Sequence, residues 1–480
     1  MAESAPVIVW FRQDLRLTDN PALDAAVRQG APVLPIYILD DENAAEWKMG
    51  AASRWWLHHS LEQLNASLRD SLRFFRGDAT TILPELVDKV QAQGVYWNRR
   101  YEPWRIARDT RIKEMLQRDS VPVKSYNGSL LFEPPNTTKA DGTPYRVFTP
   151  FYRKGCLQNG IPPRKPLPAP NDVALCTVDA GLSLDELELM PEINWYKHMS
   201  ATWSPGEDGA ARRLQQFLQS GINHYDEGRN RPDQNYVSRL SPHLHFGELS
   251  PNQPWFAVYD AMAGEELTPD ADRFLSELGW REFSNNLLYN EPTLPAKNLQ
   301  RKFDRFPWIQ DEESLRRWQH GQTGYPIVDA GMRELWRTGY MHNRVRMIVG
   351  SFLVKNLLQH WHHGARWFWD TLVDADLANN SASWQWIAGC GADAAPYFRI
   401  FNPVTQGKKF DPDGHYVRLY VPELAAMPDK FIHNPWEAPA EVLSESGVLL
   451  GDDYPEPVVD LKSSRERALA AFKSLSPSSS

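Results

Sequence analysis

Cysteine is scarce in this chain, and long apolar runs are missing from it. The 480 residues include three cysteines, Cys156, Cys176 and Cys390, which show neither metal-ligand spacing nor an even set for disulfides. Such usage is typical of a reducing compartment. No apolar run is long enough to span a bilayer, and residues 1–6 lack the pattern of a secretion signal. We therefore expect a cytoplasmic protein without a membrane partner.

Positive charge is also in short supply, because 52 Lys and Arg face 61 Asp and Glu and the net charge is −9. An acidic total argues weakly against nucleic-acid binding, but a local basic patch is what decides it. No Gly-x-Gly-x-x-Gly follows the first predicted strand, which disfavours a standard dinucleotide site there. The sequence motif that would indicate a nicotinamide-dependent oxidoreductase is therefore missing.

Tryptophan, in contrast, is abundant. The chain has 19 tryptophans beside 17 tyrosines and 20 phenylalanines. So many indoles suggest stacking surfaces or a role for the indole itself. The chain is also too long for one compact core, so we expect two domains.

The first third of the sequence alternates short apolar runs with helical stretches. This alternation predicts a parallel five-stranded sheet in an α/β domain over residues 1–133. The expected strands are residues 7–11, 33–39, 72–75, 95–97 and 121–126, and the expected helices are residues 20–29, 52–68, 82–93 and 104–117.

Residues 134–206 read as a long connector, because the proline-rich stretch 161–170 can form neither helix nor central strand. Residues 207–475 carry helical patterns and are predicted to form an all-α domain. One such pattern is the apolar series Val345, Ile348, Val349, Phe352 and Leu353. Residues 476–480 are predicted to be a frayed tail.

The segment 374–402 is the richest in residues that carry chemistry. Its polar and aromatic side chains share a short, apolar-flanked stretch, where burial is unfavourable unless each polar group has a partner. A large, flat and partly polar ligand would supply those partners. The alternative is a buried polar network that only fixes helix packing. The residues are Asp374, Asp376, Asn379, Asn380, Trp384, Trp386 and Arg399.

A second cluster follows His342. On a helix, Asn343, Arg346 and Met347 share one face, with Arg344 at its edge. Such a face suits an anion held beside an apolar ring. The alternative is a helix with a solvated basic edge.

Two weaker signals stand earlier in the chain. Ser238 or Ser241 is predicted to cap a helix beginning near Pro242, and a helix start beside Arg239 suits phosphate; the alternative is a pair of ordinary caps. Glu277 shares a helical face with Trp280 and Arg281, for which the alternative is an intrahelical Glu–Arg pair.

Together these clusters resemble the DNA photolyases of the photolyase/cryptochrome superfamily over nearly the full length. Residues 10–20 are similar to the family's opening strand and loop, residues 323–333 to its central helix entry, and residues 374–402 to its most specific signature. Residues 97–104 add a resemblance to the plant-cryptochrome side, as in class III photolyases.

The resemblance implies FAD, folded into a U shape inside the helical domain. Arg346 would pair with Asp374 beside the flavin ring, as suits a guanidinium fork against a carboxylate. Val237 stands where the family often has Thr, so one hydroxyl contact is lost. The implied FAD residues are Tyr225, Ser238, Arg239, Leu240, Ser241, Arg281, Asn343, Arg346, Asp374, Asp376 and Asn380.

Asn380 would face flavin N5. A neutral amide tolerates the reduced anionic flavin that repair needs, whereas plant cryptochromes carry an acid there that favours a signalling state. Trp384, Trp361 and Trp308 would form a chain that carries an electron hole outward. For any single tryptophan the alternative is core packing.

The resemblance also implies a substrate, the cyclobutane pyrimidine dimer. The related (6-4) enzymes carry His-His where His342 and Asn343 stand and His where Met347 stands. Glu277 would hydrogen-bond the lesion, and Trp280 and Trp386 would stack on the flipped bases. The implied DNA-binding residues are Arg229, Glu277, Trp280, Asn343, Arg344, Met347, Trp386, Arg399 and Lys408.

We therefore expect a flavoprotein lyase, a deoxyribodipyrimidine photolyase that uses blue light and electron transfer from FAD to repair UV-damaged DNA as a monomer. An antenna chromophore is expected near the α/β domain: 5,10-methenyltetrahydrofolate, with 8-hydroxy-5-deazaflavin as the alternative. The other function left open is a cryptochrome-like blue-light photoreceptor.

Overall fold

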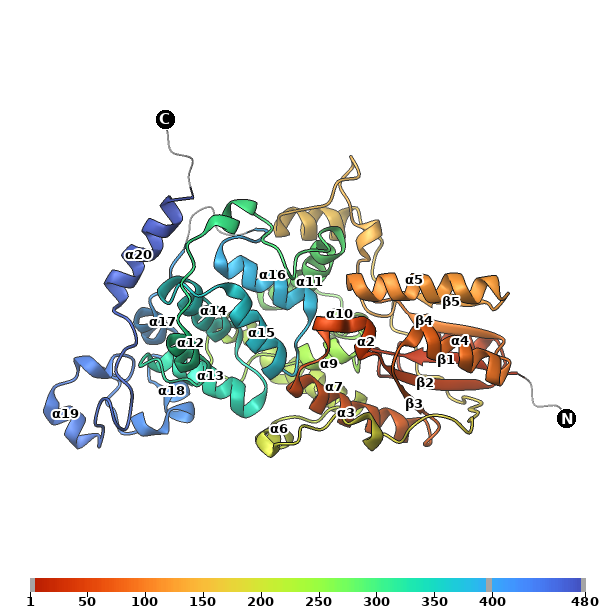
Figure 1. Ribbon diagram of the computed structural model, residues 1–480, viewed down its shortest axis with the longest axis horizontal. Helices are drawn as coiled ribbons and strands as arrows, with labels where there is room; N and C mark the ends of the chain where they lie inside the picture. The colour runs from red at the N-terminus through yellow and green to blue at the C-terminus, as the bar shows by residue number, and fades with distance from the viewer. Residues whose placement is uncertain (1–4, 394–398, 476–480) are drawn as a thin grey trace.

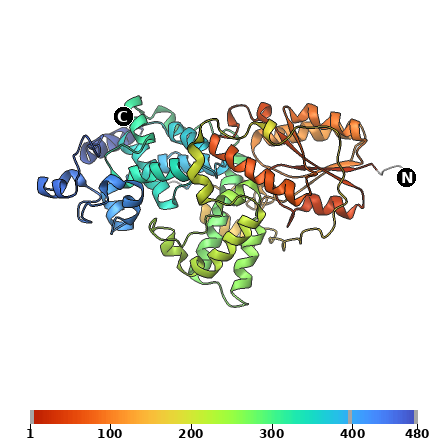
Figure 2. The same cartoon turned by 90° about the horizontal axis from the view of Figure 1, so that it is seen from below.

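The computed structural model describes residues 5–393 and 399–475. Residues 394–398 of the segment 374–402 and the predicted tail 476–480 lie outside the described residues. Figure 2 shows the α/β part at one end of the molecule and the C-terminal helices at the other. No helix in the described ranges is long and apolar enough to cross a membrane.

The N-terminal part contains a five-stranded parallel sheet in the order β3-β2-β1-β4-β5 (Figure 1), as predicted. Consecutive residues of a strand face opposite sides, so Val7 and Val9 pack with the first helices and Ile8 and Trp10 with the later ones. The strands are β1 Val7–Phe11, β2 Val33–Leu39, β3 Arg73–Arg76, β4 Gly94–Asn98 and β5 Val123–Tyr126.

Helices cover both faces of this sheet. The α1 helix begins at Pro21, and the side chain of Asn20 caps it by accepting from the Leu23 amide at 3.1 Å. The predicted start at residue 82 is wrong by three positions, because Asp78 caps the α4 helix by accepting from the Thr80 amide. The helices are α1 Pro21–Arg28, α2 Asp41–Ala44, α3 Ala51–Ser67, α4 Ala79–Val90 and α5 Pro103–Arg118.

The connector has more structure than its sequence indicated. The stretch 161–170 is free of helix and strand, as its prolines predict. On either side of it lie short helical segments: η2 Pro134–Asn136, η3 Pro150–Gln158, η4 Asp185–Leu187, η5 Asn194–Tyr196 and α6 Lys197–Thr202.

The remainder is helical, with only an isolated bridge between Leu450 and Tyr454 in the described residues. The apolar series that begins at Val345 is buried, as predicted. The α-helices are α7 Glu207–Gln216, α8 Tyr225–Gly228, α9 Ser241–Phe246, α10 Asn252–Ala261, α11 Pro269–Asn290, α12 Glu312–Gln319, α13 Pro326–Thr338, α14 Asn343–Ser351, α15 Trp361–Thr371, α16 Leu377–Ala388, α17 Pro403–Phe410, α18 His415–Tyr420, α19 Ala440–Glu445 and α20 Leu461–Lys473.

The α16 helix is central to the site, because it packs against α11, α14 and α15 at once. It carries Asn380, Trp384 and Trp386. The clusters predicted around residues 277, 343 and 380 thus lie on neighbouring helices.

Candidate functional site

A cavity of about 490 Å³ lies between α11, α14, α15 and α16. Its size is within the range of roughly 300–1,000 Å³ that is usual for ligand pockets. The predicted residues that border it are Arg229, Glu277, Trp280, Asn343, Arg346, Met347, Asp374, Asp376, Asn380, Trp384 and Trp386.

Arg346 and Asp374 form an ion pair at the wall of this cavity. Arg346 Nη2 lies 2.9 Å and 3.2 Å from the two oxygens of Asp374, and Ser241 Oγ donates to the same carboxylate at 2.6 Å. Burial alone would lower the pKa of Arg346, but Asp374, Tyr340 and Glu334 together outweigh it and raise that pKa. Arg346 and Arg239 also lie over the ring of Tyr340, at 5.2 Å and 5.3 Å. The cavity wall thus combines fixed positive charge with a carboxylate.

Asp376 begins α16, accepting from the Asn379 amide at 2.8 Å. Burial alone would raise the pKa of Asp376, but His245 and this amide more than offset it and lower that pKa. One turn into the helix, Asn380 Nδ2 donates to the Ala365 carbonyl at 2.9 Å. The orientation of this amide is therefore fixed, and its oxygen is left to accept a hydrogen bond.

Glu277 pairs with Arg229 at 2.7 Å and not with Arg281, whose guanidinium donates to Glu282 at 3.1 Å. The intrahelical Glu277–Arg281 alternative is therefore wrong. Burial raises the pKa of Glu277, although Arg229 opposes the shift. The shift favours the protonated form, and a protonated carboxyl group can donate as well as accept hydrogen bonds.

The two tryptophans predicted to stack on bases have different surroundings. Phe148 from the connector covers one face of Trp280, with ring centroids 3.8 Å apart and the planes inclined by 8°. Trp386 Nε1 donates to the Asp393 carbonyl at 3.2 Å. Each ring is held in place beside the cavity.

Of the three tryptophans predicted to form a chain, Trp384 borders the cavity and Trp361 and Trp308 do not. Trp384 packs edge-on against Phe368 at 5.0 Å. Trp361 is buried, and its Nε1 donates to Asn298 at 2.9 Å. His360 lies between Trp361 and the half-buried Trp308, at 5.6 Å and 5.1 Å from their centroids.

The remaining predicted residues are not part of the cavity lining: Tyr225, Ser238, Arg239, Leu240, Ser241, Arg281, Trp308, Arg344, Trp361, Arg399 and Lys408. The predicted serine caps are wrong. Helix α9 begins at Ser241 itself and has no side-chain cap, because Ser241 Oγ donates to Asp374 instead. Ser238 Oγ only accepts from the Leu240 amide at 3.4 Å.

Basic side chains gather beside the cavity. Burial lowers the pKa of Arg344, and the nearby charges of Arg229 and Arg399 lower it further. Arg344 also lies over the ring of Phe410 at 4.3 Å. Lys408 is exposed on α17, the helix that ends at Phe410. The predicted phosphate contacts thus include a local cluster of positive charge on an acidic protein.

Sequence reasoning missed part of the lining. Phe283, Ser284 and Leu287 continue the face of α11 that begins with Glu277 and Trp280. The i, i+3, i+7, i+10 spacing of residues 277, 280, 284 and 287 is the helical signal that could have found them. Asn379, in contrast, was among the residues predicted in the segment 374–402, and it also borders the cavity.

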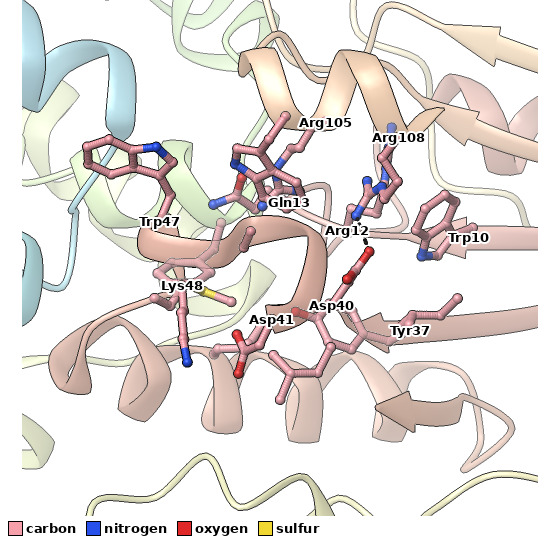
Figure 3. A pocket seen from close by; sticks show the side chains of 17 residues that line it. Trp10, Arg12, Gln13, Tyr37, Asp40, Asp41, Trp47, Lys48, Arg105 and Arg108 are labelled. Carbon is pink, nitrogen blue, oxygen red and sulfur yellow. Dashed lines mark hydrogen bonds and ion pairs between the residues drawn. The ribbon is translucent and has the colours of Figure 1, made fainter. Parts of the chain in front are cut away.

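A second cavity lies at the carboxyl ends of β1 and β2 (Figure 3), where α/β folds usually bind ligands. It contains buried polar atoms without a hydrogen-bond partner in the described residues: Trp10 Nε1, Arg12 Nε, Gln13 Oε1 and Arg105 Nε. Burial lowers the pKa of Arg105 to about 10. The cavity encloses only about 30 Å³, so its unsatisfied donors and acceptor beside Trp47 and Trp104 suit the polar edge of an aromatic ligand rather than a whole one. No sequence motif predicted this cavity.

Within the ranges 5–393 and 399–475, no group of three or more His, Cys, Asp or Glu side chains is arranged to hold a metal ion. Both cavities depend instead on guanidinium, carboxylate, amide and aromatic groups.

Comparison with known proteins agrees with this geometry. Residues 7–171 match the family described as DNA photolyase, and residues 274–474 match the FAD binding domain of DNA photolyase. A deoxyribodipyrimidine photo-lyase of Agrobacterium fabrum is 48% identical over 475 residues, which are 98% of this chain and 98% of that protein. Cryptochrome-1 of Arabidopsis thaliana is 38% identical over 98% of this chain and 70% of that protein.

The crystal structure of a bacterial class III photolyase from Agrobacterium tumefaciens superposes with a TM-score of 0.94. It is 47% identical and covers 99% of this chain and 98% of that chain. The resemblance to class III photolyases is therefore confirmed, and the chain belongs to the photolyase/cryptochrome superfamily.

Proposed function

We propose that this protein repairs cyclobutane pyrimidine dimers in UV-damaged DNA, driven by blue light and reduced FAD. The observation that carries the proposal is that one cavity is bordered both by flavin-type groups, such as Arg346 and Asn380, and by base-type groups, such as Glu277 and Trp386. Cofactor and lesion would then lie within electron-transfer reach without a further binding site.

The residues present fit FAD. Arg239 Nε and Arg229 Nε are buried without a hydrogen-bond partner in the described residues, so anionic or carbonyl oxygens of a ligand would satisfy them. We propose that Tyr225, Ser238, Arg239, Leu240, Ser241 and Arg281 hold the phosphate and ribityl end, and that Asn343, Arg346, Asp374, Asp376 and Asn380 hold the ring. The support is the Ser241–Asp374 contact, which ties the first group to the second.

When bound, reduced FAD would supply the light-driven electron that opens the cyclobutane ring, and the residues around the cavity would hold cofactor and lesion in place. Asn380 adds no charge beside the ring, and its fixed amide presents an oxygen that can accept from an N–H group. Arg346 supplies positive charge that favours the anionic reduced ring. The indoles of Trp384, Trp361 and Trp308 would carry an electron inward to reduce the flavin.

On the DNA side, Glu277 would hydrogen-bond the lesion, and Trp280 and Trp386 would stack on the extruded bases. Arg229, Arg344, Arg399 and Lys408 would bind phosphates, and Asn343 and Met347 would complete the lesion pocket. We also propose that the protein acts as a monomer on the chromosomal DNA of the cytoplasm, since one chain supplies every group named.

We propose that the second cavity, of about 30 Å³, receives the polar edge of the antenna chromophore, 5,10-methenyltetrahydrofolate rather than 8-hydroxy-5-deazaflavin, and that the rest of the chromophore lies outside it. The aromatic walls of Trp47 and Trp104 suit a flat ring, and Arg12 and Arg105 suit the carboxylates of a folate tail. An absorption spectrum after gentle purification separates the two, because folate and deazaflavin absorb at different wavelengths. A spectrum of FAD alone would contradict this assignment.

The test of repair uses the holoprotein, reduced chemically, with an oligonucleotide that contains a dimer. We expect dimers to disappear under blue light and to persist in the dark. A Trp361→Phe variant is the matched control, because chemically reduced flavin does not need the tryptophan chain: it should repair after chemical reduction but fail to reduce its own flavin under light. Intact dimers in an illuminated, flavin-loaded wild type would favour the photoreceptor function instead.

A further inference from the structure

Three side chains connect the two cavities. Gln13 borders the cavity of the α/β part, and Asp376 borders the larger cavity between the helices. Between them stands His245 of α9, whose Nε2 lies 2.8 Å from Gln13 Nε2 and whose Nδ1 lies 3.6 Å from Asp376 Oδ2. A single imidazole ring thus lies between a residue of one cavity and a residue of the other.

The donors and acceptors determine the direction of these hydrogen bonds and the ring nitrogen that carries the proton. An amide nitrogen only donates, so His245 Nε2 accepts from Gln13, and the ring proton of a neutral imidazole then sits on Nδ1. That nitrogen is the one 3.6 Å from Asp376 Oδ2, and it has no hydrogen-bond partner in the described residues. Gln13 and His245 are each 6% exposed, so water does not substitute easily for either partner.

Each end residue of this series borders a cavity. Gln13 Oε1 is buried and has no hydrogen-bond partner in the described residues. At the other end, Asp376 uses Oδ1 to accept from the Asn379 amide, and its carbonyl accepts from the Asn380 amide at 2.8 Å. A shift of Asp376 therefore moves the first turn of α16, which carries Asn380.

We propose that Gln13 and His245 form a hydrogen-bond relay that couples the occupant of the α/β cavity to the orientation of Asp376 in the FAD cavity. His245 is thus a positioning residue for Asp376. The relay rests on the proposed function, in that it takes FAD as the occupant of the larger cavity.

The relay has two discrete arrangements. In the observed one, the Gln13 amide donates to the imidazole and the imidazole proton faces Asp376. If the amide turned over, its oxygen would accept from Nε2–H, and the bare Nδ1 would face the carboxylate lone pairs, which is unfavourable. A ligand that donates to Gln13 Oε1, such as the amino or amide edge of a pterin, stabilises the observed arrangement.

The 3.6 Å separation of His245 Nδ1 from Asp376 Oδ2 is longer than a hydrogen bond. We therefore expect this distance to shorten to a hydrogen bond when a ligand binds. Coupling of this kind is reciprocal: if the donor ligand strengthens FAD binding, FAD strengthens ligand binding by the same factor. We expect a factor of roughly five, at the lower end of allosteric couplings.

The experiment measures the FAD dissociation constant of the apoprotein, with and without 5,10-methenyltetrahydrofolate. We expect the folate to tighten FAD binding in the wild type by about fivefold. In Gln13→Met, a change of similar size without hydrogen bonds, FAD should bind about threefold or more weakly and the folate effect should vanish. Gln29→Met is the matched control, because Gln29 caps α1 and borders neither cavity; it should behave as the wild type.

A second readout does not depend on bound FAD. The ¹⁵N shifts of the His245 ring report which nitrogen carries the proton, and we expect Nδ1–H in the wild type. In Gln13→Glu the carboxylate can only accept, so the proton should move to Nε2. A wild-type ring protonated on Nε2, or a Gln13→Met chain with unchanged FAD affinity, would overturn the relay.

These outcomes are separate from those of the repair function. A chain that binds FAD but leaves dimers intact under light contradicts the repair proposal and leaves the relay standing. If folate does not bind, the antenna assignment is wrong, while the FAD affinities and the imidazole shifts still decide the relay.

Discussion

Gly364 offers a sharp test of the packing that holds Trp384 beside the cavity. It lies inside α15, and a Cβ atom built there would stand 2.1 Å from Trp384 Cη2 and 2.5 Å from Cζ2 and Cζ3. Real Cβ contacts essentially never fall below 3.0 Å, so in Gly364→Ala either the indole or the helix has to move.

Two effects oppose each other in this variant. Alanine in place of glycine inside a helix gains about 0.5–1 kcal/mol. Overpacking a well-filled core costs about 1–3 kcal/mol. We expect the second effect to dominate, since the clash is with a buried ring, and Gly364→Ala should lose about 1–2 kcal/mol of unfolding free energy.

Gly350→Ala is the matched control, because its Cβ would meet Ile387 at 3.4 Å and Trp384 at 3.6 Å, which are ordinary contacts. It should be as stable as the wild type or gain up to about 0.5–1 kcal/mol from the helix. Urea unfolding of the two variants and the wild type, at one flavin concentration, measures the difference.

The position of the indole is measured separately. Displacement of Trp384 should slow light-driven reduction of the flavin in Gly364→Ala, as followed by the loss of its visible absorption. A Gly364→Ala protein with wild-type stability and wild-type photoreduction would refute the reasoning, because the indole would then have room that the structure denies it.

Three further predictions concern charge. Burial raises the pKa of Glu282 from 4.5 to about 7, so unfolding releases a proton between these values, and stability should fall as pH rises from about 4.5 to 7 and then level off. The expected loss of unfolding free energy across this pH range is about 3 kcal/mol. The urea midpoint should therefore fall with pH in the wild type but not in Glu282→Gln. Asn380→Asp should lower the flavin midpoint potential, by about 30 mV for each 1.4 kcal/mol of added repulsion in a two-electron couple; an unchanged potential in a redox titration would place residue 380 away from the ring. Arg344→Ala should reduce the slope of log affinity against log salt concentration, for binding to damaged DNA, by about one unit. The exposed Arg301→Ala is the control and should keep the wild-type slope. If the affinity of the wild type did not change with salt, the assignment of these residues to phosphate contacts would be wrong.

The arrangement of the α/β part was predictable because its signals are local. The strand Val7–Phe11 is an uninterrupted apolar run, and Asn20 before Pro21 is an ordinary helix start. The late start predicted for α4 has a local cause as well. Asp78 is a cap, but the polar residues Thr80 and Thr81 delay the apolar pattern on which the prediction depended.

The larger cavity was predictable to the extent that its residues share helical faces. Asn343, Arg346 and Met347 could be grouped by spacing alone, and all three border it. The role of Ser241 could not be predicted in this way. A hydroxyl before a helix usually caps it, and only the approach of Asp374, 133 residues later, provides the competing partner.

The sequence by itself determined which segments are helix or strand and which faces carry chemistry, because periodicity and capping are properties of neighbouring residues. Tertiary structure alone decided which faces meet. Glu277 pairs with Arg229 instead of Arg281, and Gln13 meets His245 across 232 residues of chain. The reason is physical: a buried polar group takes the partner that folding brings within about 3 Å, and spacing along the chain does not encode that distance.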